Sequence, residues 1–177
     1  GTGMIIVKLI GGLGNQLFQY AIGRRLSLLH NTLLKLDLSW FRQQENRKYK
    51  LHHFSIIENI ASDTEIEPFL KGNSRMDRNF NRLVNMLLPS YQQKYITEKS
   101  VDFDPGFFNF PDDVYLDGYW QSEKYFRDIA PILDKEFVVR SPPDHTNQKI
   151  LNLVNQEKNP VCIHIRRGDY VTVVCTK

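Results

Sequence analysis

The chain has 177 residues, of which 41% are hydrophobic and 12% aromatic, so it can build a core and is not intrinsically disordered. Its 23 Lys and Arg residues against 20 Asp and Glu give a formal charge of +3. So small an excess argues against a nucleic-acid-binding surface. Apolar runs stay well short of the roughly 20 residues that span a bilayer. We therefore predict a cytoplasmic protein without a transmembrane segment, and peripheral membrane association stays open.

The N-terminal part has the pattern of a β-α-β unit. We set residues 1–3 aside as a cloning remnant, because the natural start is expected at Met4. Residues 5–10 form an apolar run typical of a strand, residues 17–29 carry apolar side chains at helical spacing, and residues 33–38 predict a second strand. A strand, a helix and a further strand imply parallel pairing and an α/β fold.

A glycine-rich turn joins the first strand to the helix and contains Gly11, Gly12, Gly14, Asn15 and Gln16. It does not fit a dinucleotide-binding loop, because a leucine stands where the third glycine belongs, and no Gly-Lys-Ser/Thr follows. A tight structural turn and a ligand loop are both open. The two amides suit sugar hydroxyls, whereas the alternative role of Asn15 is to cap the helix.

The middle of the chain is less regular. Helices are predicted over residues 65–70 and 78–88, where they would cover one face of the sheet. His52 and His53 have no carboxylate or cysteine at ligand spacing, and adjacent side chains usually diverge, so an ordinary loop is favoured over a metal site. Residues 104–113 combine turn formers with aromatics, which favours a packed loop over a carbohydrate-facing wall.

Regular patterns return in the last third of the chain. A strand is predicted over residues 114–120, followed by a helix over residues 122–129 with Ser122 as its N-cap. Residues 146–154 have helical spacing, and residues 160–165 read as a buried strand. The two cysteines, one of them inside this strand, lack the spacing of a metal site and favour a reducing compartment.

The last predicted strand opens onto His164, Arg166, Arg167, Gly168 and Asp169. Because side chains alternate along a strand, His164 and Arg166 share one face and Arg167 points to the other, until the glycine turns the chain. A solvated surface and a local anion site both remain open on these residues alone.

Residues 11–21, 116–126 and 164–171 together resemble the α-1,2-fucosyltransferase family in content, order and spacing. The resemblance runs from Met4 to about Val171. It implies inverting, metal-independent transfer of L-fucose from GDP-fucose to the 2-hydroxyl of a galactoside, with no cofactor. It also implies a GT-B fold of two Rossmann-like domains, each a parallel sheet flanked by helices.

The resemblance also implies roles for individual residues. Arg166 matches the arginine that stabilises the leaving phosphate, as a fixed guanidinium can without a metal. His164 and Asp169 are the titratable candidates beside it, but a neighbouring arginine makes Asp169 a weaker base, so the general base stays unassigned. Arg167 either contacts substrate or pairs with Asp169. The residues expected to face the sugar and phosphates are Gly12, Gly14, Asn15 and Gln16.

On this basis residues 4–159 are the N-terminal Rossmann-like, acceptor-side domain, and residues 160–177 are the start of a truncated donor-binding region. We expect weak GDP-fucose binding, little transfer, and an apolar surface that a homodimer could cover. The alternative is a non-catalytic carbohydrate- or nucleotide-binding module derived from such an enzyme.

Overall fold

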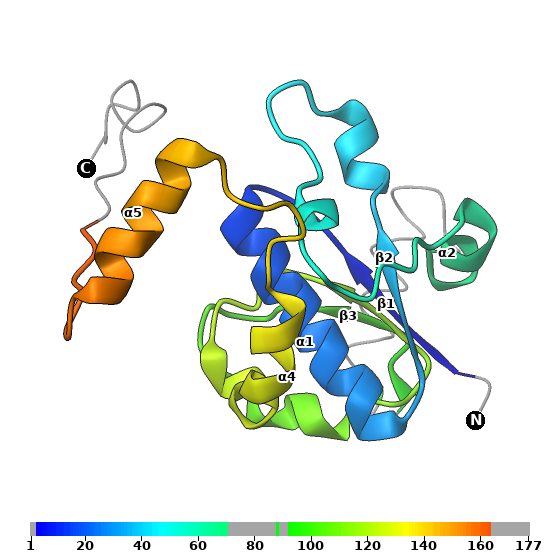
Figure 1. Cartoon of the computed structure of the whole chain (residues 1–177). Coiled ribbons are helices and arrows are strands. Elements are labelled where there is room, and N and C mark those ends of the chain that lie inside the picture. The colour runs from blue at the N-terminus through cyan, green and yellow to red at the C-terminus, as the bar shows by residue number, and fades with distance from the viewer. Residues whose placement is uncertain (1–2, 71–87, 89–91, 164–177) are drawn as a thin grey trace, which may run out of the picture. The chain divides into compact units, whose positions relative to one another are not determined.

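The structure is a computed structural model that describes residues 3–70, 88 and 92–163 (Figure 1). The chain divides into two compact units, Gly1–Arg140 and Ser141–Lys177. The first unit contains the sheet and the glycine turn.

Within the described residues, four strands form one parallel sheet in the order β2-β1-β4-β3. They are β1 (Met4–Lys8), β2 (Leu33–Asp37), β3 (Tyr95–Thr97) and β4 (Val114–Asp117). The predicted β-α-β unit and the α/β class are confirmed, because β1 and β2 are parallel neighbours joined by a helix. The two-domain GT-B arrangement stays a prediction.

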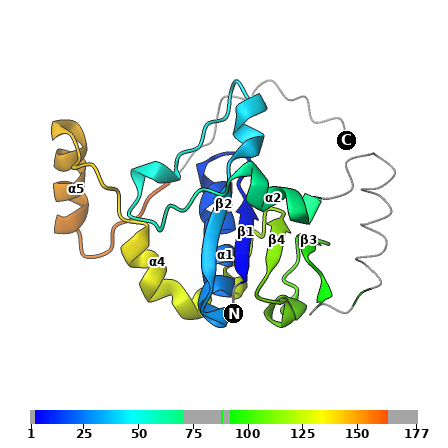
Figure 2. The same cartoon turned by 90° about the vertical axis from the view of Figure 1, so that its right-hand side faces the viewer.

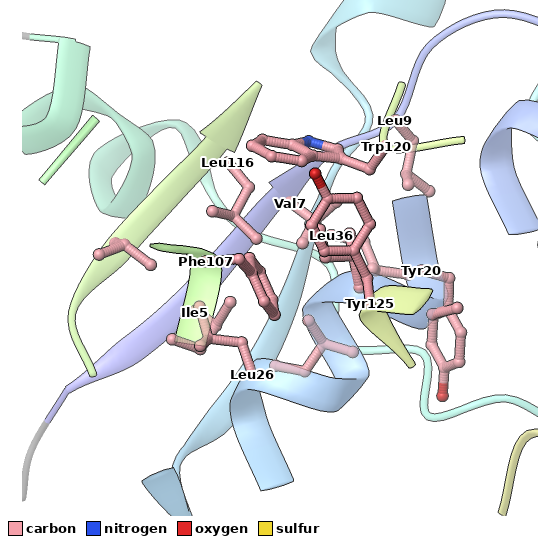
Figure 3. Packing of buried hydrophobic residues seen from close by; sticks show 14 of the residues in the cluster. Ile5, Val7, Leu9, Tyr20, Leu26, Leu36, Phe107, Leu116, Trp120 and Tyr125 are labelled. Carbon is pink, nitrogen blue, oxygen red and sulfur yellow. The ribbon is translucent and has the colours of Figure 1, made fainter. Parts of the chain in front are cut away.

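Helix α1 (Leu13–His30) covers one face of the sheet (Figure 1). It approaches closely at Gly23, where an added Cβ would lie 2.3 Å from Cγ2 of Val7. The core on this face takes side chains from β1, β2 and β4, and in Figure 3 Trp120 and Leu9 lie at one end of this cluster, with Leu26 at the other. The predicted apolar stripe of α1 therefore reaches the core as far as Leu26, whereas Leu29 is 41% exposed.

Helix α2 (Asp63–Leu70) covers the opposite face, so that α1 and α2 lie on either side of the strands (Figure 2). Its Ile66 packs with Ile6 and Tyr115 in a smaller core. The helix predicted over residues 65–70 is confirmed. The helix predicted over residues 78–88 lies outside the described residues, except for residue 88.

The single helix predicted over residues 122–129 is wrong. Two short 3-10 helices, η5 (Glu123–Tyr125) and η6 (Arg127–Ile129), precede α4 (Ala130–Glu136), and the Ser122 side chain makes no capping hydrogen bond. The chain breaks at Phe126, whose φ of −141° is not helical. Burial of Tyr125 in the core, where its Oη accepts from the backbone N–H of Asp104, outweighs local helix propensity.

The connecting segments form further 3-10 helices, η1 (Ser39–Gln43), η2 (Leu51–His53) and η4 (Pro105–Asn109). Residues 104–113 form the packed loop that we predicted, since Phe107 is fully buried. The expectation that His52 and His53 diverge is wrong, because their ring centroids lie 3.9 Å apart.

The second unit contains α5 (His145–Gln156), which confirms the helix predicted over residues 146–154. Asp144 caps it by accepting a hydrogen bond of 2.8 Å from the backbone N–H of Asn147. The buried strand predicted from residue 160 is wrong for residues 160–163, which form no strand and leave Cys162 exposed. An apolar run becomes a buried strand only where neighbouring strands satisfy its backbone, and this run has none among the described residues.

Candidate functional site at the carboxyl edge of the sheet

Two turns meet at the carboxyl edge of the sheet. β1 and β4 are parallel neighbours, with Val7 opposite Leu116, so the glycine turn after β1 lies beside the turn over residues 118–122 after β4. In open α/β sheets, ligands bind outside the carboxyl ends of the strands. This edge is therefore the candidate site.

Side chains from α1 join the two turns. Gln19 accepts a hydrogen bond of 2.9 Å from the backbone N–H of Ile10 and donates one of 3.1 Å to the carbonyl of Gly118. Asn15 Oδ1 accepts a bond of 2.7 Å from Gln121 Nε2. Hydrogen bonds from Gln19 and Asn15 thus connect the two turns. Gln19 was missed from sequence, although an amide on the apolar stripe of a helix is a signal for such a role.

The glycines of the first turn serve different purposes. Gly11 has a φ of +78°, and an added Cβ would lie 2.4 Å from Asn15 Nδ2, so the fold itself requires glycine there. At Gly12 the nearest atom to an added Cβ is Nη1 of Arg47, at 4.0 Å. At Gly14, apart from the adjacent residues and the backbone of the helix itself, nothing in the described structure lies within 4 Å of that position. Gly12 and Gly14 therefore leave open space at the edge of the sheet.

The two amides of the turn behave differently from each other. Gln16 is fully buried, with Nε2 donating to the carbonyls of Gly11 (3.1 Å) and Lys48 (3.0 Å) and Oε1 accepting from the N–H of Lys50 (2.8 Å). It holds the turn from inside, and its contact with substrate stays a prediction. Asn15 is partly exposed and lies inside α1, whose N-cap is Gly12, so the capping alternative for Asn15 is wrong.

The turn after β4 holds Trp120 in an unusual conformation. Its φ is +55°, and it is buried except for 3% of its surface. Its indole Nε1 has no hydrogen-bond partner among the described residues. The Glu98 carboxylate fixes this backbone by accepting from the N–H groups of Tyr119 (2.8 Å) and Trp120 (2.9 Å). A strained residue with an unpaired donor is typical of functional turns.

A second polar group lies at the same edge on the α2 face. Lys8 Nζ lies 3.0 Å from Asp117 Oδ2, which also accepts a bond of 2.5 Å from Tyr95 Oη. Asp37 Oδ2 accepts a bond of 2.5 Å from Tyr115 Oη. Burial, with the Asp37 charge, raises the pKa of Tyr115, so its hydroxyl stays a donor at neutral pH.

The other predicted site residues are His164, Arg166, Arg167 and Asp169, and all four lie outside the described residues. Their roles stay predictions.

Comparison with known proteins decides the family. The family whose sequence pattern matches residues 2–177 is described as Glycosyl transferase family 11. The chain belongs to this family. The family assignment confirms the resemblance to α-1,2-fucosyltransferases and makes the chain part of a sugar-transferring family.

Two relatives come from Escherichia coli. An alpha-1,2-colitosyltransferase is 31% identical over 175 residues, which are 97% of this chain and 57% of the relative. The O-antigen biosynthesis glycosyltransferase WbnK is 30% identical over 184 residues, covering 93% of this chain and 59% of the relative. The chain thus spans somewhat over half the length of these family 11 relatives. No solved structure matches it. In the described part of the chain, no helix is long and apolar enough to cross a membrane.

Proposed function

We propose that this family 11 chain serves the transfer of L-fucose from GDP-fucose to the 2-hydroxyl of a galactoside, with inversion and without a metal ion. Family membership and the two transferase relatives support the sugar transfer itself. The α-1,2-fucosyltransferase resemblance supports the donor and the linkage. The partners are then a nucleotide sugar and a galactose-containing glycan.

The observation that carries the proposal is the open space at Gly14. Glycine in a helix costs about 0.5–1 kcal/mol relative to alanine, and nothing in the described structure fills the space of the missing methyl group. The residue lies in the first turn of α1, where the helix dipole is positive and no acidic side chain offsets it. A glycine that the fold does not need, at a helix start, fits the close approach of a phosphate or sugar.

In the proposed reaction the acceptor oxygen attacks fucose C1 while the bond from C1 to the β-phosphate oxygen breaks. GDP leaves with the electron pair of that bond, and the hydroxyl proton passes to a base or to water. Arg166 is proposed to stabilise the negative charge that develops on the departing diphosphate. His164 and Asp169 remain candidates for nucleotide contact and proton transfer, with Arg167 as support.

The arrangement we propose for the whole protein is GT-B, with this chain supplying the Rossmann-like acceptor-side domain. GDP-fucose would then bind between this domain and a second one that begins at residue 160. A homodimer and peripheral attachment to a membrane belong to the same proposal.

The test is a single-turnover assay with the protein in excess over radiolabelled GDP-fucose and with lactose as acceptor. We expect slow formation of a fucosylated product whose linkage, read by NMR, is to the galactose 2-hydroxyl. Transfer to another hydroxyl, or efficient use of another nucleotide sugar in place of GDP-fucose, would contradict the proposal.

The printed name of the first relative raises one competing donor, a nucleotide-linked colitose. The same assay with that donor decides between the two sugars. Saturable glycan binding without any transfer, unchanged by Arg166→Ala, would instead favour the non-catalytic binding module.

A further inference from the structure

We propose that Lys8 and Asp117 bind two neighbouring hydroxyls of the acceptor sugar, on the α2 side of the carboxyl edge. This inference rests on the proposed function and deepens it by placing the acceptor. Nothing in the motifs that indicated the family assigns a role to Lys8.

The two residues belong to a row of charged side chains across three strands. Lys8 pairs in register with Asp37 and bonds Asp117 on its other side. Since register partners in a parallel sheet point to the same face, the row stands on the face that carries Ile6 and Tyr115. Below the row this face is covered by α2, through apolar contacts and the ion pair between Lys35 and Glu65. The polar row therefore begins where the covered core ends.

Two tyrosines fix the carboxylates in place. Tyr95 donates to Asp117, Tyr115 donates to Asp37, and the two rings stack with centroids 5.2 Å apart and planes 9° apart. Asp37 is 1% exposed, and both of its oxygens are occupied, because Oδ1 accepts a 2.7 Å bond from the N–H of Ser39. Asp37 is thus a positioning residue that cannot itself reach a ligand.

Lys8 and Asp117 keep hydrogen-bonding capacity that the described residues do not use. Among the described residues, Lys8 Nζ donates a hydrogen bond only to Asp117, so two of its three N–H groups are available for a ligand. Asp117 Oδ1 accepts no bond there, because both partners of the carboxylate bind Oδ2. The side chains are 27% and 20% exposed, so both reach solvent at the edge. Among the described residues, one unused acceptor therefore lies beside two unused donors.

The charges of the row select the class of ligand. Two carboxylates against one ammonium repel a phosphate, while the ammonium between them opposes a bound cation. A neutral hydroxyl group both donates and accepts, so one hydroxyl can accept from Lys8 while its neighbour donates to Asp117. Adjacent hydroxyls on a pyranose ring offer this combination of an acceptor and a donor. The structure thus favours a neutral sugar, which among the two substrates describes the galactoside.

The test titrates methyl β-D-galactoside into the ¹⁵N-labelled chain, with methyl α-L-fucoside as the donor-sugar comparison. We expect the largest amide shifts at Lys8, Asp117 and Tyr95 with the galactoside. Asp117→Asn keeps the shape of the side chain but replaces the free acceptor, and it should weaken galactoside binding about tenfold or more. Lys8→Met should weaken it as well.

The matched control is Asp113→Asn, just before the other end of β4. Asp113 pairs with Lys94 at 2.8 Å in an exposed ion pair, and its substitution should leave binding unchanged. The inference is overturned if the wild-type chain binds no galactoside, if the shifts concentrate at Gly12 and Gly14, if the fucoside binds there instead, or if a folded Asp117→Asn variant binds equally well.

A separate transfer assay distinguishes a failure of this inference from a failure of the proposed function. Fucose transfer without galactoside shifts at Lys8 and Asp117 would sink this inference and leave the proposed function standing. Galactoside binding at these residues with transfer of a different sugar would contradict the proposed function and leave this inference standing.

Discussion

The sharpest test of the glycine turn replaces Gly14 and Gly11 separately by alanine. At Gly14 the new methyl group enters open space inside the first turn of α1. Removing a helix glycine there should raise the free energy of unfolding by about 0.5–1 kcal/mol. For a domain of this size, that gain corresponds to a Tm increase of about 1–4 °C.

Gly11→Ala should have the opposite effect. The φ of +78° is left-handed, which costs an L-residue about 1–2 kcal/mol, and the methyl group must also displace Asn15 Nδ2. Urea unfolding of both variants beside the wild-type chain gives the two free energies. A destabilised Gly14→Ala variant would show that the fold needs this glycine, and the reasoning would fail.

The second measurement is of GDP binding, by calorimetry or NMR. If the open space at Gly14 exists for a ligand, the stabilised Gly14→Ala variant should bind GDP about tenfold more weakly or worse, a loss of about 1.4 kcal/mol. A more stable variant that binds GDP as tightly as the wild type would refute a ligand-facing role for Gly14. The reasoning requires that Gly14→Ala raises the free energy of unfolding and lowers the affinity for GDP.

Three further outcomes follow. Arg166→Ala should lower GDP-fucose-dependent transfer by about 10²–10³-fold with unchanged circular dichroism, and full activity would exclude its role at the leaving phosphate. Glu98→Ala removes the acceptor of the buried Trp120 N–H and should cost about 1–3 kcal/mol in urea unfolding, whereas Glu98→Gln should lose less. The hydrogen bond from Lys35, with those from Ser62, lowers the pKa of Glu65 from 4.5 to about 2. The free energy of unfolding should therefore decrease as the pH falls from 4.5 to about 2. Urea midpoints measured across this range should decrease less in a Lys35→Met variant.

Local patterns were sufficient for the first half of the sheet. The alternation from strand to helix to strand, with an apolar stripe on residues 17–29, specifies β1, α1 and β2, because the apolar run of β1 is buried on both faces and α1 buries one face. The same reasoning failed at residues 122–129, where Tyr125 must reach the core and breaks the helix. Helix propensity describes a segment by itself, while the break is set by residues far along the chain.

The site was predictable in place but not in detail. The glycine turn at the end of a strand indicated the carboxyl edge, yet sequence could not tell that Gln16 faces inward while Gly14 faces open space. That distinction depends on where Lys48 and Lys50 return to the turn. Lys8 and Asp117 were missed because their partnership joins positions 109 residues apart. A charge at the end of β1, β2 and β4 was the available signal.

The two faces of this edge suit opposite kinds of substrate. On the α1 side the turn offers a helix N-terminus and the nearby guanidinium of Arg47, 4.0 Å from a Cβ built at Gly12, which favour the diphosphate of the donor. On the α2 side the carboxylates of Asp37 and Asp117 would repel that diphosphate, and Asp117 could accept a hydroxyl. These charges would direct the proposed donor and acceptor to opposite faces. Since β1 carries Lys8 on one side and leads into Gly11 on the other, we expect donor and acceptor to meet over the ends of β1 and β4.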